Sequence, residues 1–247
     1  MAIAIDRIRA FEPPEGYYVA FSGGKGKDMV KSNKSKAHTR YRTADKTIVP
    51  GVTTVLGLLN KPALVPWANK LGLQGIDVGK YVDDKAAIGT LGHAMVTDKL
   101  MGIETDTSDY SKNQIDLAEN CALSFWEWEK ENHIEKVFFC ERPMVSEVCR
   151  VGGTLDIYAQ VNGRKEIIDL KTGSGIYDEH IWQVAALKKL LEENGYDVDG
   201  VRIVNIPRTE NEAFMQRIAS DKESEVGWDI FKALLSVYNL KKEMGRS

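Results

Sequence analysis

Two aspartates and a lysine are the residues of this sequence whose types and spacing could do chemistry. Asp156 ends the run GGTLD, and Asp169 and Lys171 lie in the run IIDLKTG. Both runs have the apolar, β-branched character of strands. The dipeptide Asn162-Gly163 between them is typical of a two-residue type I′ hairpin turn. We therefore expect all three charged side chains on one hairpin.

The turn predicts which side chains meet. If Val161 pairs with Arg164, the antiparallel register puts Asp156 directly opposite Asp169, with Cβ atoms roughly 5 Å apart. Lys171 lies two residues beyond Asp169 and shares its face. The same register predicts an apolar opposite face on which Leu155 pairs with Leu170 and Ile157 with Ile168.

Opposed carboxylates destabilise a sheet unless a cation lies between them, and hard divalent cations take carboxylate oxygens as ligands. A salt bridge from Lys171 to one aspartate is the simpler alternative, but it leaves the other aspartate unexplained. The pattern therefore favours a metal site, provided that no β-bulge at Gly152-Gly153 shifts Asp156 by one residue.

A third acid, Glu141, is a further candidate. A turn centred on Glu147-Val148 would pair Glu141 with Thr154 and put its carboxylate on the face of Asp156. The alternative is an ordinary surface glutamate.

The elements that must position these residues follow from hydrophobic periodicity. Residues 1–50 contain a short strand and a basic loop. Residues 51–247 form one domain with a helical part, 51–135, and an α/β core, 136–247. In the core we expect three successive strands, a helix over 178–194, a fourth strand and a final helix over 221–243. This β-β-β-α-β order predicts an α/β (α+β) fold with a mixed sheet flanked by helices.

Composition narrows the function classes. The chain has 247 residues, a net charge of −3, and 43% hydrophobic residues. No apolar run approaches the ~18 residues of a membrane span, and charged residues come too early for a signal peptide. Three cysteines without a CxxC pair favour a reducing, cytoplasmic location, which is the host cytoplasm if the protein is encoded by a phage.

Basic charge is concentrated in one segment. Between residues 23 and 46, eight lysines and arginines stand against two aspartates, so that the rest of the chain is acidic. Such a segment is typical of an arm that contacts phosphates, although a solvated loop is the alternative. The candidate DNA-contacting residues are Lys25, Lys27, Lys31, Lys34, Lys36, Arg40 and Arg42.

The runs GGTLD and IIDLKTG, followed by Gln183, resemble the PD-(D/E)XK nuclease superfamily, in particular its RecB-like and phage exonuclease branch. The segment VTTVLGLLNKPALVPWA also looks like the N-terminal part of phage-type members and of the mitochondrial genome maintenance exonuclease. The resemblance covers about residues 50 to 206. It implies a restriction-endonuclease-like core and a DNA exonuclease that uses one or two Mg²⁺ or Mn²⁺ ions in recombination, repair or DNA processing.

Carried over to this sequence, the resemblance implies metal ligation by Asp156, Asp169 and the carbonyl of Leu170. It makes Lys171 the catalytic lysine, and Gln183 a group that orients the water or a phosphate. The motif G-x-x-x-H in GTLGH implies a further ligand, His93. Glu141 remains a candidate third acid of the catalytic group.

The sequence also departs from the pattern. Leu187 stands where the family helix often has a tyrosine, and three scattered cysteines argue against the iron–sulfur cluster of some relatives. DNA is the expected partner, together with a single-strand annealing or recombination protein, and some relatives are homo-oligomers.

Two other functions stay open at this point. One is a DNA-binding module on the same fold without catalysis. The other is an ATP-pyrophosphatase-type enzyme that uses the SGG loop at 22–24, but the residues that follow this loop fit that class poorly.

Overall fold

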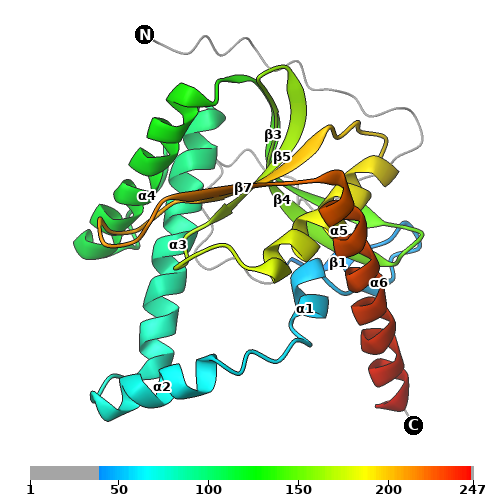
Figure 1. The fold of residues 1–247 in the computed structure, drawn as a ribbon, viewed down its shortest axis with the longest axis horizontal. Helices are drawn as coiled ribbons and strands as arrows, with labels where there is room; N and C mark the ends of the chain where they lie inside the picture. Colours follow the sequence, from blue (N-terminus) through cyan, green and yellow to red (C-terminus); the bar gives the residue numbers. More distant parts are fainter. Residues whose placement is uncertain (1–38, 246–247) are drawn as a thin grey trace.

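A five-stranded sheet forms the centre of the molecule in the computed structural model, which describes residues 39–245 (Figure 1). Its strands stand in the order β3-β4-β5-β6-β7, and only β5 and β6 pair in parallel. The strands are β3 (Ile134–Ser146), β4 (Val151–Val161), β5 (Arg164–Lys171), β6 (Gly200–Asn205) and β7 (Met215–Ala219). The predicted α+β class and the β-β-β-α-β order are confirmed.

Helices cover both faces of this sheet. The described helices are α1 (Val52–Leu56), α2 (Leu64–Leu73), α3 (Val78–Leu100), α4 (Lys112–Glu131), α5 (Asp178–Glu193) and α6 (Asp221–Met244). In Figure 1, α3 and α4 lie on one side of the sheet, and α5 and α6 on the other. Each side has its own apolar core, with Phe125 of α4 in one and Phe231 of α6 in the other.

The predicted β4–β5 hairpin is present. Asn162 and Gly163 both have positive φ, 49° and 79°, as a type I′ turn requires. Backbone pairing starts at Val161↔Arg164, as predicted from the turn, and continues to Ile157↔Ile168. It ends there, so the expected pairs Asp156↔Asp169 and Leu155↔Leu170 lie beyond the last residues that the two strands pair.

The predicted β3–β4 register is wrong by two residues. Thr154 pairs with Pro143 instead of Glu141. The reason is the connection, a four-residue turn over 147–150 in place of a two-residue turn. With the longer turn, the register places Glu141 opposite Asp156 itself.

The expected apolar face is also only partly right. Ile157, Ile168 and Leu170 pack together on the α3–α4 side, but Leu155 packs on the α5–α6 side. Residues two apart on a regular strand share a face. The facing of β4 therefore reverses at Asp156.

The two glycines in GGTLD have packing roles instead of forming a bulge. A Cβ on Gly152 would lie 2.2 Å from the ring of Tyr41, and one on Gly153 would lie 2.5 Å from a methyl group of Leu187. The strand thus admits Tyr41 on one face and α5 on the other, and the register from Ser146↔Val151 to Arg142↔Leu155 is unbroken.

Some elements differ from the predictions. Strand β7 was not predicted, because its residues are mostly exposed and give no clear alternation. A small hairpin of β1 (Tyr41–Arg42) and β2 (Ile48–Val49) precedes α1. The predicted strand and SGG loop of the first 38 residues lie outside the described residues.

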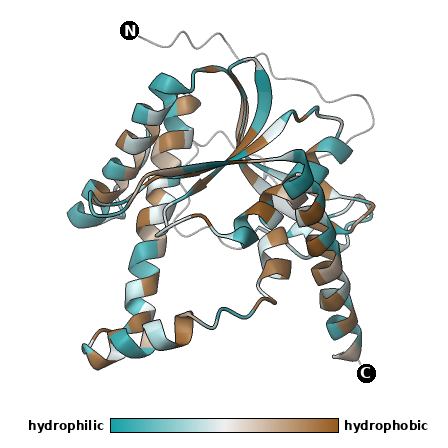
Figure 2. Ribbon diagram, in the orientation of Figure 1, coloured by the Kyte–Doolittle hydropathy of each residue, from teal (hydrophilic) through white to brown (hydrophobic). Residues whose placement is uncertain are grey.

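Helix α2 stands apart from both cores. None of its side chains is buried, and Val65 and Leu73 are largely exposed. Figure 2 shows hydrophobic colour on this helix, which lies away from the sheet beside the N-terminal end of α3. Within residues 39–245, no helix is both long and apolar enough to cross a membrane.

Candidate metal centre

Glu141 and Asp156 lie opposite each other where strands β3 and β4 reverse their facing. They come between the pairs Cys140↔Ile157 and Arg142↔Leu155. Glu141 has φ 50°, which is uncommon for a residue with a side chain and is found where local structure imposes it. This twist takes both carboxylates out of the regular alternation and brings them to one place.

Helix α3 brings His93 to the same place. It packs closely at two glycines: a Cβ on Gly89 would lie 2.6 Å from Oγ1 of Thr172, and one on Gly92 would lie 3.0 Å from Cys121. Thr172 directly follows Lys171, so the contact at Gly89 holds α3 against the end of β5. His93 is one turn further along α3, with its Nδ1 3.6 Å from Oδ2 of Asp156.

The side chains of His93, Glu141 and Asp156 could hold a metal ion. One ligand atom from each lies within 4.8 Å of the other two. An octahedral ion with bonds of about 2.1 Å has ligand atoms about 3 to 4.2 Å apart, so small side-chain adjustments suffice. Carboxylates suit Mg²⁺ and Mn²⁺, and an imidazole is tolerated by transition metals. The donor set therefore fits a divalent cation, and all three side chains are only partly buried.

Asp169 and Lys171 form a second part of the site. Their side chains form a close ion pair at the end of β5, with 2% and 19% of their surfaces exposed. Gln183 of α5 donates a hydrogen bond of 3.2 Å from Nε2 to Oδ1 of Asp169. Burial raises the pKa of Asp169, Lys171 opposes this shift, and the nearby Asp156 adds to it. In this conformation Asp169 thus faces Lys171 and Gln183 and is not one of the three clustered ligands.

The backbone of Leu170 joins the two parts. Its N–H donates to Oδ2 of Asp156 over 2.8 Å, in place of a strand partner. Because the N–H and C=O of one strand residue point to the same side, the Leu170 carbonyl also points toward Asp156. This direction fits the ligand role that the family resemblance implies for it.

The predicted DNA-contacting residues are only partly described. Arg40 directly precedes the small hairpin and Arg42 belongs to its strand β1; both are exposed, and Arg42 donates to the carbonyl of Lys46 over 3.0 Å. The five lysines of this set, from Lys25 to Lys36, lie outside the described residues.

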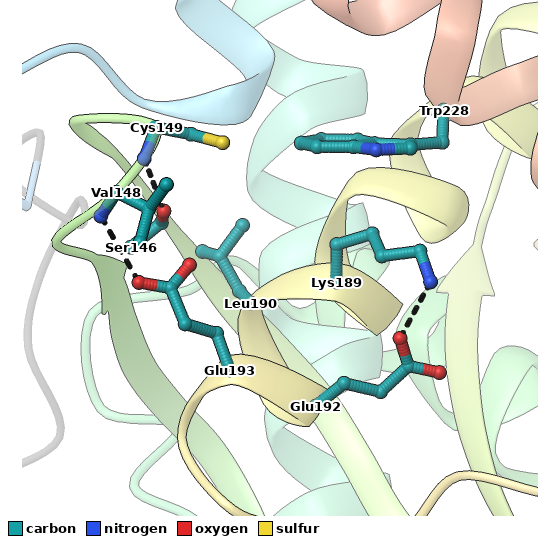
Figure 3. A pocket seen from close by; sticks show the side chains of 8 residues that line it. All are labelled: Ser146, Val148, Cys149, Lys189, Leu190, Glu192, Glu193 and Trp228. Atoms are coloured by element: carbon teal, nitrogen blue, oxygen red, sulfur yellow. Dashed lines mark hydrogen bonds and ion pairs between the residues drawn. The ribbon is translucent and has the colours of Figure 1, made fainter.

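A pocket of about 270 Å³ lies elsewhere, at the C-terminal half of α5 (Figure 3). Its walls include Cys149 after β3, Leu190 of α5 and the ring of Trp228 of α6. None of the residues that line it belongs to the metal-binding group or to the Asp169–Lys171 pair. The two glutamates that line it already have partners: Glu192 pairs with Lys189 over 2.7 Å, and Glu193 accepts the backbone N–H of Val148 over 3.1 Å.

Comparisons with known proteins add little to this geometry. No family model matches the sequence, and no curated protein matches it. Among solved structures, the chain is similar to the crystal structure of a "putative exonuclease" from Eubacterium rectale, with 13% identity, 62% of this chain covered and 68% of the other. The TM-score is 0.44, and conclusions about function therefore rest on the site itself.

The structure adds one residue that the sequence patterns did not single out. His180 lies in the first turn of α5, three residues before Gln183, and interacts electrostatically with Lys171 and Asp169. The spacing H-x-x-Q places both side chains on one helix face and could have been noticed in the sequence.

Proposed function

We propose that this chain is a metal-dependent deoxyribonuclease that hydrolyses phosphodiester bonds, acting as an exonuclease in DNA recombination, repair or processing. The observation that carries the proposal is the approach of His93, Glu141 and Asp156, three ligand side chains from three elements. The buried Asp169–Lys171 pair beside them supports the same reading. Without a cation, the facing carboxylates of Glu141 and Asp156 would repel each other, as like charges opposite each other in a sheet do. A purely structural role therefore explains their placement poorly.

The residues that would bind Mg²⁺ or Mn²⁺ are His93, Glu141 and Asp156. Asp169 and the carbonyl of Leu170 lie beside them. A divalent ion bound there would lower the pKa of a water molecule and stabilise the charge that develops on the leaving oxygen. One or two ions are compatible with this number of oxygen donors.

Other residues of the chain position the reactants and bind the DNA. Lys171 holds a positive charge next to the reacting phosphate and positions the attacking water. Gln183 fixes the Asp169 carboxylate through its amide and keeps it directed at Lys171. Exposed Arg40 and Arg42, with the preceding lysines, bind the DNA backbone through phosphates, which predicts sequence-tolerant, salt-sensitive binding.

The test is DNA digestion with Mg²⁺ or Mn²⁺ by the wild type and by the variants Asp169→Ala and Lys171→Ala. We expect each variant to lose at least about 100-fold in rate while keeping its far-UV circular dichroism spectrum. Folded variants that digest DNA as fast as the wild type would refute the proposal. A wild type that binds DNA without cutting it would indicate the non-catalytic DNA-binding module instead.

A further inference from the structure

We propose that His180 contacts the substrate, donating a hydrogen bond from Nε2–H to a non-bridging oxygen of the DNA phosphate that lies beside Lys171. The inference rests on the proposed nuclease function and assigns a phosphate contact to a residue outside the metal-binding group. It follows from where α5 places His180, from which ring nitrogen carries the proton, and from the charges around the ring.

The position follows from the direction of α5. Because β5 and β6 are parallel and α5 connects them, α5 runs back along the sheet against the direction of β5. Gln183 is held level with Asp169 by its hydrogen bond. The three residues from Gln183 back to His180 rise about 4.5 Å along α5, and two residues onward along β5 is about 6.6 Å. Both steps lead the same way, so His180 comes level with Lys171.

The proton position follows from the start of the helix. The backbone N–H of Tyr177 donates to Nδ1 of His180 over 3.2 Å. A neutral imidazole that accepts at Nδ1 carries its proton on Nε2. The Tyr177 ring packs against the imidazole at a centroid distance of 5.5 Å and holds its orientation. Nε2–H is then the donor that remains for a ligand.

The surroundings keep the ring neutral and suit an anion. Burial, together with the Lys171 cation, lowers the pKa of His180 to about 4. The other charged groups that act on it are Asp169, Glu179 and Lys61, and the last two form an ion pair of 3.0 Å. A neutral donor beside one cation can bind a phosphate oxygen without the cost of burying a second positive charge.

A capping role alone is the competing explanation, because His180 also accepts the N–H of Tyr177. Glutamine can do both tasks. In this chain Gln114 stands at the same position of α4 and accepts the N–H of its N-cap residue, Ser111, over 2.9 Å. The variant His180→Gln therefore keeps a cap acceptor and an N–H donor, whereas His180→Ala keeps neither.

The experiment compares steady-state cleavage of a DNA oligonucleotide by the wild type, His180→Ala, His180→Gln and the control His133→Ala, whose side chain is exposed on the loop before β3. We expect His180→Ala to lose about 10- to 100-fold in kcat/KM, as for a hydrogen bond to a charged group. His180→Gln should stay within about fivefold of the wild type, and His133→Ala should match it.

Substrates with a single methylphosphonate linkage, moved along the strand, locate the contact. At one linkage the neutral substitution should slow the wild type but not slow His180→Ala further, because the same interaction is removed twice. In EDTA, which prevents cleavage, His180→Ala should bind the unmodified strand more weakly than the wild type does. The loss in affinity should match the loss that the methylphosphonate at that linkage causes in the wild type.

Three results would overturn the inference while leaving the nuclease function intact. One is cleavage by His180→Ala at the wild-type rate, and another is an equal loss of activity in His180→Ala and His180→Gln that parallels a loss of thermal stability. The third is that the losses from His180→Ala and from the methylphosphonate add fully at every linkage. A wild type that does not cut DNA would refute the proposed function, and the inference with it.

Discussion

At the scale of single residues, the site depends on carboxylates placed where regular strand structure is interrupted. Glu141 adopts a left-handed backbone conformation, and Asp156 accepts the backbone N–H that a strand partner would otherwise take. The left-handed conformation of Glu141 costs stability, and the approach of the two carboxylates fits a site for a cation. The role of each residue can be tested through metal binding, separately from activity.

We predict that Glu141→Gln weakens Mn²⁺ binding at least about tenfold. At saturating Mn²⁺ this removes about 1.4 kcal/mol of the metal-linked stabilisation, which thermal unfolding with and without Mn²⁺ measures. Asp156→Asn should behave in the same way. The control Glu119→Gln changes an exposed acid of α4 and should keep the full Mn²⁺ shift. An unchanged shift in both site variants would exclude these carboxylates as ligands.

At the scale of elements, the site needs α3 to lie unusually close to the end of β5. The contact at Gly89 leaves no room for a side chain, since Oγ1 of Thr172 would be 2.6 Å from a Cβ. This packing sets the position of the His93 backbone relative to Asp156, and the conformation of the His93 side chain sets the rest. The spacing G-x-x-x-H therefore has a physical meaning: the glycine sets the approach of the helix, and the histidine uses it.

We predict that Gly89→Ala lowers the free energy of unfolding by about 1–3 kcal/mol and weakens Mn²⁺ binding, because α3 must move away from Thr172. Chemical denaturation and Mn²⁺ titration measure the two effects. Adding Thr172→Ala should restore both, since the next atom lies 3.8 Å away. Gly72→Ala in α2 meets no atom within 4 Å and should stabilise the protein slightly.

The start of α6 gives a prediction about pH. Glu223 pairs with Arg217 over 2.6 Å and accepts hydrogen bonds from Ser220, and these contacts lower its pKa from 4.5 to about 2. A lowered carboxyl pKa contributes stability above the unfolded value, which is lost as the pH falls from about 4.5 to 2. Glu223→Gln should therefore be less stable than the wild type at pH 7, by up to about 1 kcal/mol because the pair is exposed. In denaturation curves the difference should shrink over this range and be lost below about pH 2, and a difference independent of pH would contradict this account.

At the scale of the whole molecule, a buried polar group connects the sheet to its α4 side. Arg202 of β6 pairs with Glu166 of β5 over 2.9 Å and also donates to Asn132 after α4 and Gln216 of β7. Four separate parts of the chain thus meet at one guanidinium. The same packing orders β7, the edge strand without a clear sequence pattern.

We predict that Arg202→Met costs about 3–5 kcal/mol of unfolding free energy, because it leaves the buried Glu166 with only the exposed Arg164, 3.4 Å away, as a cationic partner. Removing both charges with Arg202→Met and Glu166→Leu should recover much of this loss. Lys130→Ala, which breaks the exposed pair with Glu127, should cost under about 1 kcal/mol. Denaturant titration measures all four proteins, and a small loss in Arg202→Met would show that the network does not carry stability.

The sequence by itself determined the local features. The Asn162-Gly163 turn predicted the β4–β5 register, because a two-residue turn leaves one pairing. Periodicity predicted the element order, because helices and strands bury their apolar residues at different spacings. The tertiary structure alone decided how distant segments meet: the four-residue turn that puts Glu141 opposite Asp156, the reversal that sends Leu155 to the other core, and the approach of α3 that brings in His93. These depend on packing between elements far apart in the chain. The G-x-x-x-H spacing marked Gly89 and His93, but it does not specify which segment the helix packs against.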